Sequence, residues 1–385
     1  KLSRKLEIGM AKTSKLKIAL VHDFLTSLGG AERVLMALHE LFPEAPVYTL
    51  LYDESKVGDI FPKERVITSG LQKIPRLPGM HKFMFPFMPG AVENFDLEGF
   101  DVVLSSSSAY VHGVVTNLDT THICYYHSPM RYAWDYTHEY LKEQNLGAIG
   151  DFFVSNMMHK IRQWDFLASD RVDLPIANSK TVQNRIRKYY RREAEIIYPP
   201  VDTEKFEAHG KNEGYFLIVS NLTPYKKVDL AVELFNRLGK RLIIIGDGPE
   251  MPMLKRMAAK NVDFLGYKSD EVTKEYFENC RAFIFPGEED FGIAPIEAMA
   301  CGKPVLAYRK GGLTETVIEG ETGEFFNEQT VESMEAALTQ LLINEKTYNP
   351  KEIAKHAKKY SRENFEKSIK KVIESAIMQA NKPKK

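Results

Sequence analysis

The 385-residue sequence lacks the features that mark several large classes of protein. Its three cysteines, Cys124, Cys280 and Cys301, lie far apart, so we expect reduced, buried thiols and neither a disulfide framework nor a cysteine-bound metal. Positive and negative side chains number 52 each, so no charge excess favours nucleic acid as a partner. No apolar run reaches the roughly 18 residues that a membrane helix needs, and the N-terminus lacks the apolar segment of a signal peptide. These absences favour a cytoplasmic protein.

The composition is that of a globular protein, with 44% hydrophobic and 27% charged residues. Because one hydrophobic core seldom organises 385 residues, we expect two domains of under about 200 residues each. The boundary is expected after Tyr198, where Pro199 and Pro200 stop a strand. The expected divisions are a flexible arm or expression remnant (1–15), an N-terminal domain (16–200), a C-terminal domain (201–360) and a final helix (361–385).

Apolar runs alternate with helical patterns through both halves, which predicts an α/β fold of two Rossmann-like domains with parallel sheets. In the first half the expected strands are Lys17–His22, Val47–Leu50, Val66–Thr68, Val102–Ser105, His122–Tyr126, Leu174–Ala177 and Ile196–Tyr198. In the second half they are Tyr215–Ser220, Arg241–Ile245, Val262–Leu265, Ala282–Pro286 and Pro304–Ala307. Ligands of such sheets bind at the carboxyl ends of the strands, so we expect them in a cleft between the domains.

The most informative segment runs from Glu288 to Gly302, where two carboxylates bracket a glycine that opens a helix. A diphosphate suits such a helix N-terminus, whose unpaired N–H groups carry partial positive charge. The expected donors are the backbone groups of Phe291, Gly292, Ile293 and Ala294. Glu289 and Glu297 would accept hydrogen bonds from a hexose and a ribose. Taken alone, the two are as readily a solvated loop acid and a helical surface residue.

From Glu289 to Val305 the sequence contains, in order, an acid, a Phe-Gly pair, a Pro, a second Glu, Ala-Met-Ala and Cys-Gly-x-Pro-Val. This series of motifs resembles that of the retaining glycosyltransferases of the two-domain family 4. Further short motifs that resemble those of the family are Gly29-Gly30-Ala31-Glu32, His127-Ser128-Pro129, Asn178-Ser179, Pro224-Tyr225-Lys226-Lys227 and Gly246-Asp247-Gly248. The resemblance implies the GT-B fold, two facing Rossmann-like domains with a ligand cleft, and a last helix that packs back on the first domain.

The segment from Cys124 to Asp135 is similar to the corresponding sequences of the mannosyltransferase-like branch that assembles bacterial surface polysaccharides. This implies a retaining hexosyltransferase that moves mannose from GDP-mannose to a polysaccharide or lipid-linked acceptor. The alternatives are a UDP-sugar-dependent transferase of the same fold and a degenerate sugar-nucleotide-binding or scaffold protein. No Asp-x-Asp motif or metal-spaced carboxylate cluster occurs, so we expect no metal and no cofactor beyond the nucleotide-sugar co-substrate.

In the first domain the resemblance implies that Gly29 and Gly30 face the donor diphosphate and that Glu32 helps to fix it. Without that resemblance, two glycines before a helix would be interpreted as an ordinary turn with no role in binding. His127 follows a strand, where it is either a structural histidine or, as the resemblance implies, a hydrogen-bond partner of the donor sugar. A pKa near neutrality would also let His127 assist proton movement.

In the second domain the family has an arginine and, five residues later, a lysine that neutralise the leaving diphosphate. Lys226 matches the lysine, but Asn221 occupies the arginine position. An amide offers only neutral donors, so Lys227 or Arg131 would have to compensate, or activity would be reduced. The resemblance also places Gly246 near the nucleotide and Tyr267 near the base.

Two further segments remain open. Leu77 to Phe95 is rich in Met and Phe, with His81 and Lys82 among them; it either packs as an internal lid, which we favour, or touches a membrane surface or lipid-linked acceptor. The four serines from Ser105 to Ser108 are expected to form a polar loop after a strand.

Overall fold

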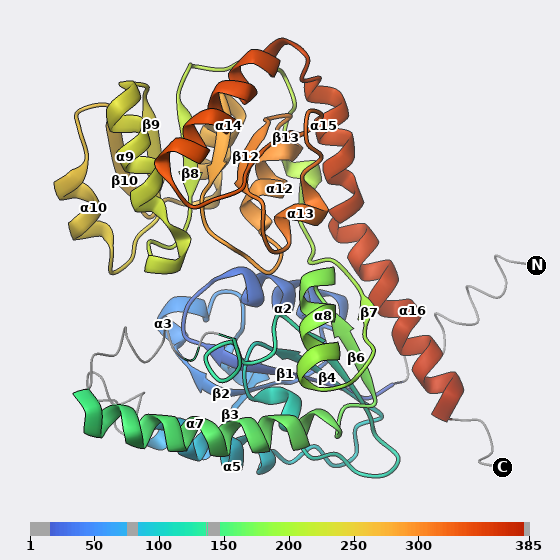
Figure 1. The fold of residues 1–385 in the computed structure, drawn as a ribbon. Helices are drawn as coiled ribbons and strands as arrows, with labels where there is room; N and C mark the ends of the chain where they lie inside the picture. The colour runs from blue at the N-terminus through green and yellow to red at the C-terminus, as the bar shows by residue number, and fades with distance from the viewer. Residues whose placement is uncertain (1–15, 75–83, 136, 138–146, 381–385) are drawn as a thin grey trace, which may run out of the picture. The chain divides into compact units, whose positions relative to one another are not determined.

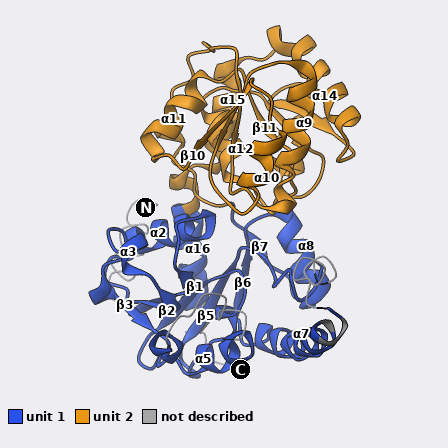
Figure 2. Cartoon of the chain, turned by 90° about the vertical axis from the view of Figure 1, so that its left-hand side faces the viewer, with its two compact units in different colours: residues 1–198, 366–385 blue, residues 199–365 orange. Residues whose placement is uncertain are grey.

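The structure is a computed structural model that describes residues 16–74, 84–135, 137 and 147–380. Its chain divides into two compact units, which Figure 2 colours separately. Unit 1 holds residues 1–198 and 366–385, and unit 2 holds residues 199–365. Each unit is built on one parallel sheet with helices against it (Figure 1).

Unit 1 has a seven-stranded sheet in the order β3-β2-β1-β4-β5-β6-β7. Its strands are β1 (Ile18–Leu25), β2 (Val47–Tyr52), β3 (Val66–Thr68), β4 (Val102–Ser107), β5 (Thr121–Tyr126), β6 (Leu174–Ala177) and β7 (Glu195–Ile196). Its α-helices are α2 (Gly30–Leu41), α3 (Glu54–Val57), α5 (Met88–Glu93), α7 (Gly147–Ser169), α8 (Lys180–Tyr189) and, from Glu366 onward, α16 (Arg362–Ala380). Its central strands are buried along their length because helices cover the sheet, which explains their nearly unbroken apolar runs.

Unit 2 has a six-stranded sheet in the order β10-β9-β8-β11-β12-β13. Its strands are β8 (Phe216–Val219), β9 (Leu242–Ile245), β10 (Val262–Gly266), β11 (Ala282–Phe285), β12 (Val305–Tyr308) and β13 (Gly323–Phe326). Its α-helices are α9 (Val228–Leu238), α10 (Met251–Met257), α11 (Asp270–Asn279), α12 (Ile293–Ala300), α13 (Leu313–Thr316), α14 (Val331–Ile343) and α15 (Pro350–Ala357). These elements confirm the predicted α/β class and the two Rossmann-like sheets.

In both sheets the chain adds strands first on one side of the first strand and then on the other, and the place of this reversal is the switch point. In unit 1 the chain adds β2 and β3 on one side of β1 and then returns to add β4 on the other side. In unit 2, β8 and β11 are neighbours in the same way. The loops that leave two such strands diverge at the carboxyl edge of the sheet, and ligands of open α/β sheets bind there. The residues at these two switch points are therefore the first to consider as a functional site.

Every strand that the sequence predicts is present, most of them with shifted ends, and β13 is an additional edge strand. The expected polar loop from Ser105 to Ser108 was wrong. Ser105, Ser106 and Ser107 continue β4 and are fully buried, paired with β5 on one side, while Ser105 and Ser106 also pair with β1. Burial is tolerated because their hydroxyls have hydrogen-bond partners in the rings of His122, His127 and His112.

The Met- and Phe-rich segment lies partly outside the described residues, which resume at Met84. Met84, Met88, Val92 and Phe95 are buried in the core that β1, β2 and β4 share with α5 and α7. The described part thus packs against its own unit, as the favoured interpretation required. Phe87 differs, because 64% of its surface is exposed.

Candidate functional site

At the switch point of unit 1, a chain of polar contacts joins β1, β4 and the residue after β5. The Nδ1 atom of His22 lies 3.1 Å from the Ser106 hydroxyl, which lies 2.8 Å from Nε2 of His127. His22 and Ser106 face each other in the register of β1 and β4, and both are buried. A serine hydroxyl donates one hydrogen bond and accepts others, so it can link two imidazoles. The contacts hold both rings at the carboxyl edge of the sheet.

Glu32 connects this chain to the glycine loop. One carboxylate oxygen accepts a hydrogen bond from the Gly29 N–H at 2.8 Å, and the other lies 3.6 Å from Nε2 of His22. Burial alone would raise the pKa of Glu32, but the hydrogen bond and charge of His22 outweigh it and the pKa is lowered. Glu32 therefore stays ionised and closes the N-terminus of α2, which begins at Gly30. In this structure it positions the loop that the sequence assigned to a diphosphate.

His127 does not have the near-neutral pKa that the sequence analysis considered. Burial, aided by the nearby His22, lowers the pKa of His127 to about 3. Its backbone is also fixed, because its N–H donates to the Ser107 carbonyl and its carbonyl accepts from the Asn178 amide. A neutral, fixed imidazole is a hydrogen-bonding group and is unsuited to exchange protons near pH 7.

Asp23 is a site residue that the sequence analysis missed. It is buried in β1, and its carboxylate accepts four backbone hydrogen bonds of 2.6 to 3.0 Å, from Ser108, Ala109, Tyr110 and Val111. The carboxylate thus fixes the loop that leaves β4 beside the Ser106 contact. The available signal was the His22-Asp23 pair, two polar residues inside an otherwise apolar run at the end of the first strand.

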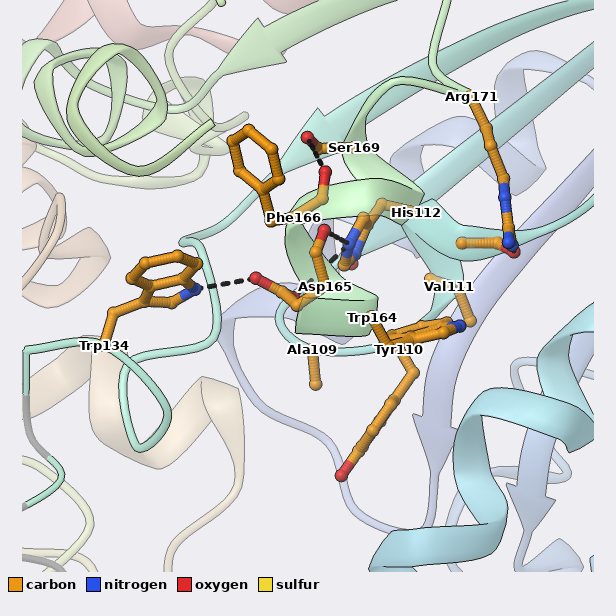
Figure 3. A network of polar contacts seen from close by, with 12 residues as sticks. Ala109, Tyr110, Val111, His112, Trp134, Trp164, Asp165, Phe166, Ser169 and Arg171 are labelled. Atoms are coloured by element: carbon orange, nitrogen blue, oxygen red, sulfur yellow. Dashed lines mark hydrogen bonds and ion pairs between the residues drawn. The ribbon is translucent and has the colours of Figure 1, made fainter. Parts of the chain in front are cut away.

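A second buried network lies against α7 (Figure 3). The Trp134 indole donates to one oxygen of Asp165 at 2.7 Å, and the other oxygen lies 3.4 Å from Nε2 of His112. Burial raises the pKa of Asp165 to about 7 and lowers that of His112 to about 4. His112 also reaches the Ser107 hydroxyl at 3.4 Å, so this network ends one residue from the His22–Ser106 contact.

In unit 2 the switch point brings together two predicted catalytic residues. Lys226 lies in the loop after β8, Glu289 lies in the loop after β11, and the two side chains form an ion pair. Burial alone would lower the pKa of Lys226, but the Glu289 carboxylate outweighs this effect and the pKa is raised. The site therefore holds a fully charged ammonium, which also lies 5.1 Å from the centre of the Tyr225 ring.

Close backbone contacts hold these loops together. A side chain at Gly287 would lie 2.8 Å from the Cα atom of Lys226, so only glycine lets the two loops approach. Gly311 has a φ of 68° and touches the backbone oxygen of Glu289, which accepts the Gly312 N–H at 2.8 Å. The loops after β8, β11 and β12 thus form one support for the Lys226–Glu289 pair.

The helix that follows Glu289 begins as the sequence predicts. Gly292 caps α12 with a φ of 90°, and the half-exposed Ile293 and Ala294 open its first turn. The Phe291 side chain is buried against Tyr360, so only its backbone is a candidate for ligand contact. Glu297 is half-buried one turn further along.

The other predicted site residues of unit 2 include Asn221, Lys227, Gly246 and Tyr267. Asn221 is exposed after β8, and Lys227 takes a left-handed conformation with a φ of 53° between the short 3-10 helix η6 (Pro224–Lys226) and α9. Gly246 has a φ of 134°, and a side chain there would collide with the Ser220 carbonyl, so the position requires glycine. Tyr267 is 75% exposed at the end of β10, on the sheet's edge strand. In the described residues no group of three or more His, Cys, Asp or Glu side chains is placed to hold a metal.

Two family profiles match consecutive parts of the chain. Residues 28–205 match Glycosyltransferase Family 4, and residues 201–364 match Glycosyl transferases group 1. Both profiles describe glycosyltransferases, and together they extend from residue 28 to residue 364 of the chain.

Curated proteins similar to this chain include an uncharacterized glycosyltransferase of Methanocaldococcus jannaschii, 30% identical over 54% of the chain and 61% of the relative. The GDP-mannose-dependent alpha-(1-6)-phosphatidylinositol monomannoside mannosyltransferase of Mycolicibacterium smegmatis is 30% identical over 39% of the chain and 47% of the relative. Both matches span less than two thirds of the relative. The alpha-1,3/1,6-mannosyltransferase ALG2 of Candida glabrata is 23% identical over 80% of the chain and 79% of the relative.

Solved structures support the GT-B fold of this chain. HepE of Anabaena, in complex with UDP and glucose, has a TM-score of 0.71 at 18% identity and covers 94% of this chain and 100% of its own. Sucrose-phosphate synthase of Thermosynechococcus elongatus has a TM-score of 0.72 at 17% identity and covers 95% of this chain and 100% of its own. Among the helices that the structure describes, none is long and apolar enough to span a bilayer.

Proposed function

We propose that this protein is a retaining hexosyltransferase that moves mannose from GDP-mannose to a polysaccharide or lipid-linked acceptor. The observation that carries the proposal is the Lys226–Glu289 pair, held at the switch point of unit 2 beside the N-terminus of α12. A cation and a helix N-terminus suit a leaving diphosphate, and a carboxylate suits sugar hydroxyls.

The pair suggests how the residues act. When the donor binds, the Lys226 ammonium exchanges the Glu289 carboxylate for diphosphate oxygen, and Glu289 turns to the hydroxyls of the hexose. The negative charge that develops on the leaving group is then met by a positioned ammonium and by the N–H groups that open α12, which is electrostatic catalysis. In the same-face mechanism that we propose for this transfer, the acceptor attacks from the face that the diphosphate leaves, and a phosphate oxygen takes the acceptor proton. No protein base is then needed, in keeping with the low pKa of His127.

The remaining roles follow the same proposal. His127 offers a neutral hydrogen bond to the donor sugar, and the Gly29–Gly30 loop, positioned by Glu32, faces the diphosphate. In unit 2, Glu297 binds the ribose and the exposed ring of Tyr267 stacks near the base. The reaction uses no metal and takes place in the cytoplasm or at the inner face of the membrane.

The choice of mannose and GDP rests on relatives. The Mycolicibacterium smegmatis and Candida glabrata proteins are both named as mannosyltransferases, the first as GDP-mannose-dependent. The alternative is a UDP-sugar, which is favoured by the complexes of HepE with UDP and with UDP-glucose.

Calorimetry with GDP, UDP, ADP and their sugar conjugates tests the donor. We expect GDP and GDP-mannose to bind tightest and to raise the unfolding temperature, because a ligand that binds only the folded state stabilises it. A preference for UDP would keep the reaction class and overturn the sugar. Retention is then tested by NMR of the first product formed: an anomeric configuration opposite to that of the donor would contradict it.

The degenerate alternative rests on Asn221, which stands where the family has arginine. Asn221→Arg adds a charge at an exposed position, so we expect diphosphate affinity to rise by less than about tenfold if Lys226 already serves the site. A protein that turns over no donor as wild type and becomes active as Asn221→Arg would instead show that the lost charge had disabled it.

A further inference from the structure

The outer face of α7 is the largest feature of unit 1 that the proposed transfer does not use. Phe152, Phe153 and Leu167 are 66%, 67% and 63% exposed, and Phe166 is 38% exposed. The helix rises about 1.5 Å per residue, so these side chains mark both ends of a stretch of about 20 Å. Soluble proteins rarely leave so many large apolar side chains on one exposed helix face.

The opposite face of α7 is firmly packed, so the exposure does not come from a frayed helix. Met158, Ile161, Asp165 and Ala168 are buried against the sheet. The Trp164 indole donates at 2.8 Å to Glu93 of α5, which lies alongside α7 under the same sheet face (Figures 1 and 2). The unit therefore presents the exposed residues on a fixed support.

Basic side chains lie among these apolar residues, and the exposed Asp170 follows just past the end of α7. His159 and Lys160 are exposed between the two aromatic ends, and Arg162 is half-buried beside them. Among the exposed residues from Phe152 to Leu167, none is acidic; Asp165 points into the core. Phenylalanine and leucine combined with lysine are typical of helices that lie in the plane of an anionic membrane surface.

We propose that the outer face of α7 binds the surface of an anionic lipid bilayer. The phenylalanines and Leu167 would enter the boundary between headgroups and acyl chains, while Lys160 would meet lipid phosphate. The helix would lie on the bilayer without crossing it. This surface is made of other residues than the predicted Leu77–Phe95 contact, of which Met84, Met88, Val92 and Phe95 are buried. It does not depend on which nucleotide sugar the protein uses.

Vesicle co-sedimentation of the full chain tests the proposal without turnover. We expect binding to vesicles of phosphatidylcholine mixed with phosphatidylglycerol, and weaker binding to phosphatidylcholine alone. The double variant Phe152→Ser/Phe153→Ser should lose about tenfold or more in binding, since two apolar anchors are removed. Lys160→Glu should weaken binding to the anionic vesicles more than binding to phosphatidylcholine alone. Reversing this charge changes only the electrostatic contribution to the binding free energy.

Leu118→Ser is the matched control, because Leu118 is 89% exposed in the same unit but lies outside α7. It should bind vesicles as the wild type does, and unchanged circular dichroism should show that all variants are folded. The proposal is overturned if the wild type does not sediment with anionic vesicles, or if the double variant binds equally well. It is also overturned if ultracentrifugation shows that the wild type is a dimer that Phe152→Ser/Phe153→Ser separates, since the face would then join two copies.

Discussion

The two units share one strand order but place their polar residues differently at the switch point. In unit 1, His22 and Ser106 lie within neighbouring strands and are buried, and the chain of contacts continues to His127. In unit 2, Lys226 and Glu289 lie in loops beyond the strands, with side chains 14% and 24% exposed. The same topology thus presents a buried, hydrogen-bonded chain in one unit and an accessible ion pair in the other.

The two arrangements differ in how easily their polar groups can exchange one partner for another. A buried hydrogen-bonded chain is costly to disturb, because each polar group would lose a hydrogen-bond partner away from water. An ion pair that is partly open to solvent is replaced more easily, since water or a ligand can take over either partner. We infer that unit 1 holds a fixed surface, whereas unit 2 holds charges that change partners when the donor arrives.

The largest expected effect comes from removing the cation of unit 2. Lys226→Ala should lower kcat by about 100- to 1,000-fold, as loss of one preorganised charge-stabilising group does in other enzymes. Steady-state kinetics with the nucleotide sugar that binds in calorimetry measures the loss.

Lys310→Ala is the matched control, because Lys310 forms an exposed ion pair with Glu288 one residue from Glu289. Its kcat should stay within about twofold of the wild type. If Lys226→Ala behaved like this control, the exchange of partners would be wrong. A donor-binding role for the exposed Asn221 and Lys227 would then become the better account.

The next effect concerns the buried carboxylate of unit 1. Asp23→Asn replaces an acceptor of four backbone N–H groups with an amide whose own NH2 faces two of them. We expect a loss of about 3 kcal/mol in the free energy of unfolding, while Glu289→Gln in unit 2 should cost about 1 kcal/mol. Urea unfolding gives the ranking, and amide exchange at residues 108–111 should accelerate in Asp23→Asn only. Equal losses would remove the contrast between the two units.

The sequence predicts much of the unit 2 site because its chemistry lies in loops with local signals. The Phe-Gly pair and the second glutamate mark the start of α12, and a glycine-rich turn follows β9. The strand β13 was missed because Gly-Glu-Phe-Phe is a short run with a charged residue, and an edge strand needs little apolar sequence. Which ligand each residue binds stays a prediction.

The unit 1 site was less accessible to prediction because its contacts are distant in sequence. His22 and Ser106 are 84 residues apart and meet only through the pairing of β1 with β4. The serine run was assigned to a loop because serines are usually exposed. Its burial is stabilised by histidines that no local pattern connects to it.

A smaller effect should follow from breaking the polar chain of unit 1 at its centre. Ser106→Ala removes the hydroxyl between His22 and His127, so the His127 ring loses a partner that fixes it. We expect kcat to fall by about tenfold, equivalent to one or two hydrogen bonds, with little change in donor affinity. Ser106→Thr keeps a hydroxyl in a strand and should recover most of the loss. If the threonine variant were as slow as the alanine variant, packing rather than the hydroxyl would be responsible.

The smallest effect is a change in pH dependence from Asp165. Its pKa is raised by burial from 3.8 to about 7, so between these values the unfolded chain releases a proton that the folded chain keeps. The ionisation of Asp165 therefore makes the protein less stable as pH rises toward and through 7. Asp165→Asn keeps an acceptor for the Trp134 indole and removes the titration. Relative to wild type it should gain about 1 kcal/mol of stability between about pH 6 and about pH 8.

Both proteins in that comparison keep His112, whose pKa is lowered by burial to about 4 and whose own effect is a loss of stability as pH falls. The difference between them thus isolates Asp165, and thermal unfolding at several pH values measures it. Asp170→Asn, at an exposed carboxylate just past the end of α7, should leave the profile unchanged. A flat difference for Asp165→Asn would mean that Asp165 is ionised in the folded chain at both pH values. The network of unit 1 would then hold a charge as unit 2 does, and the contrast between the units would be restricted to the His22–Ser106–His127 contacts.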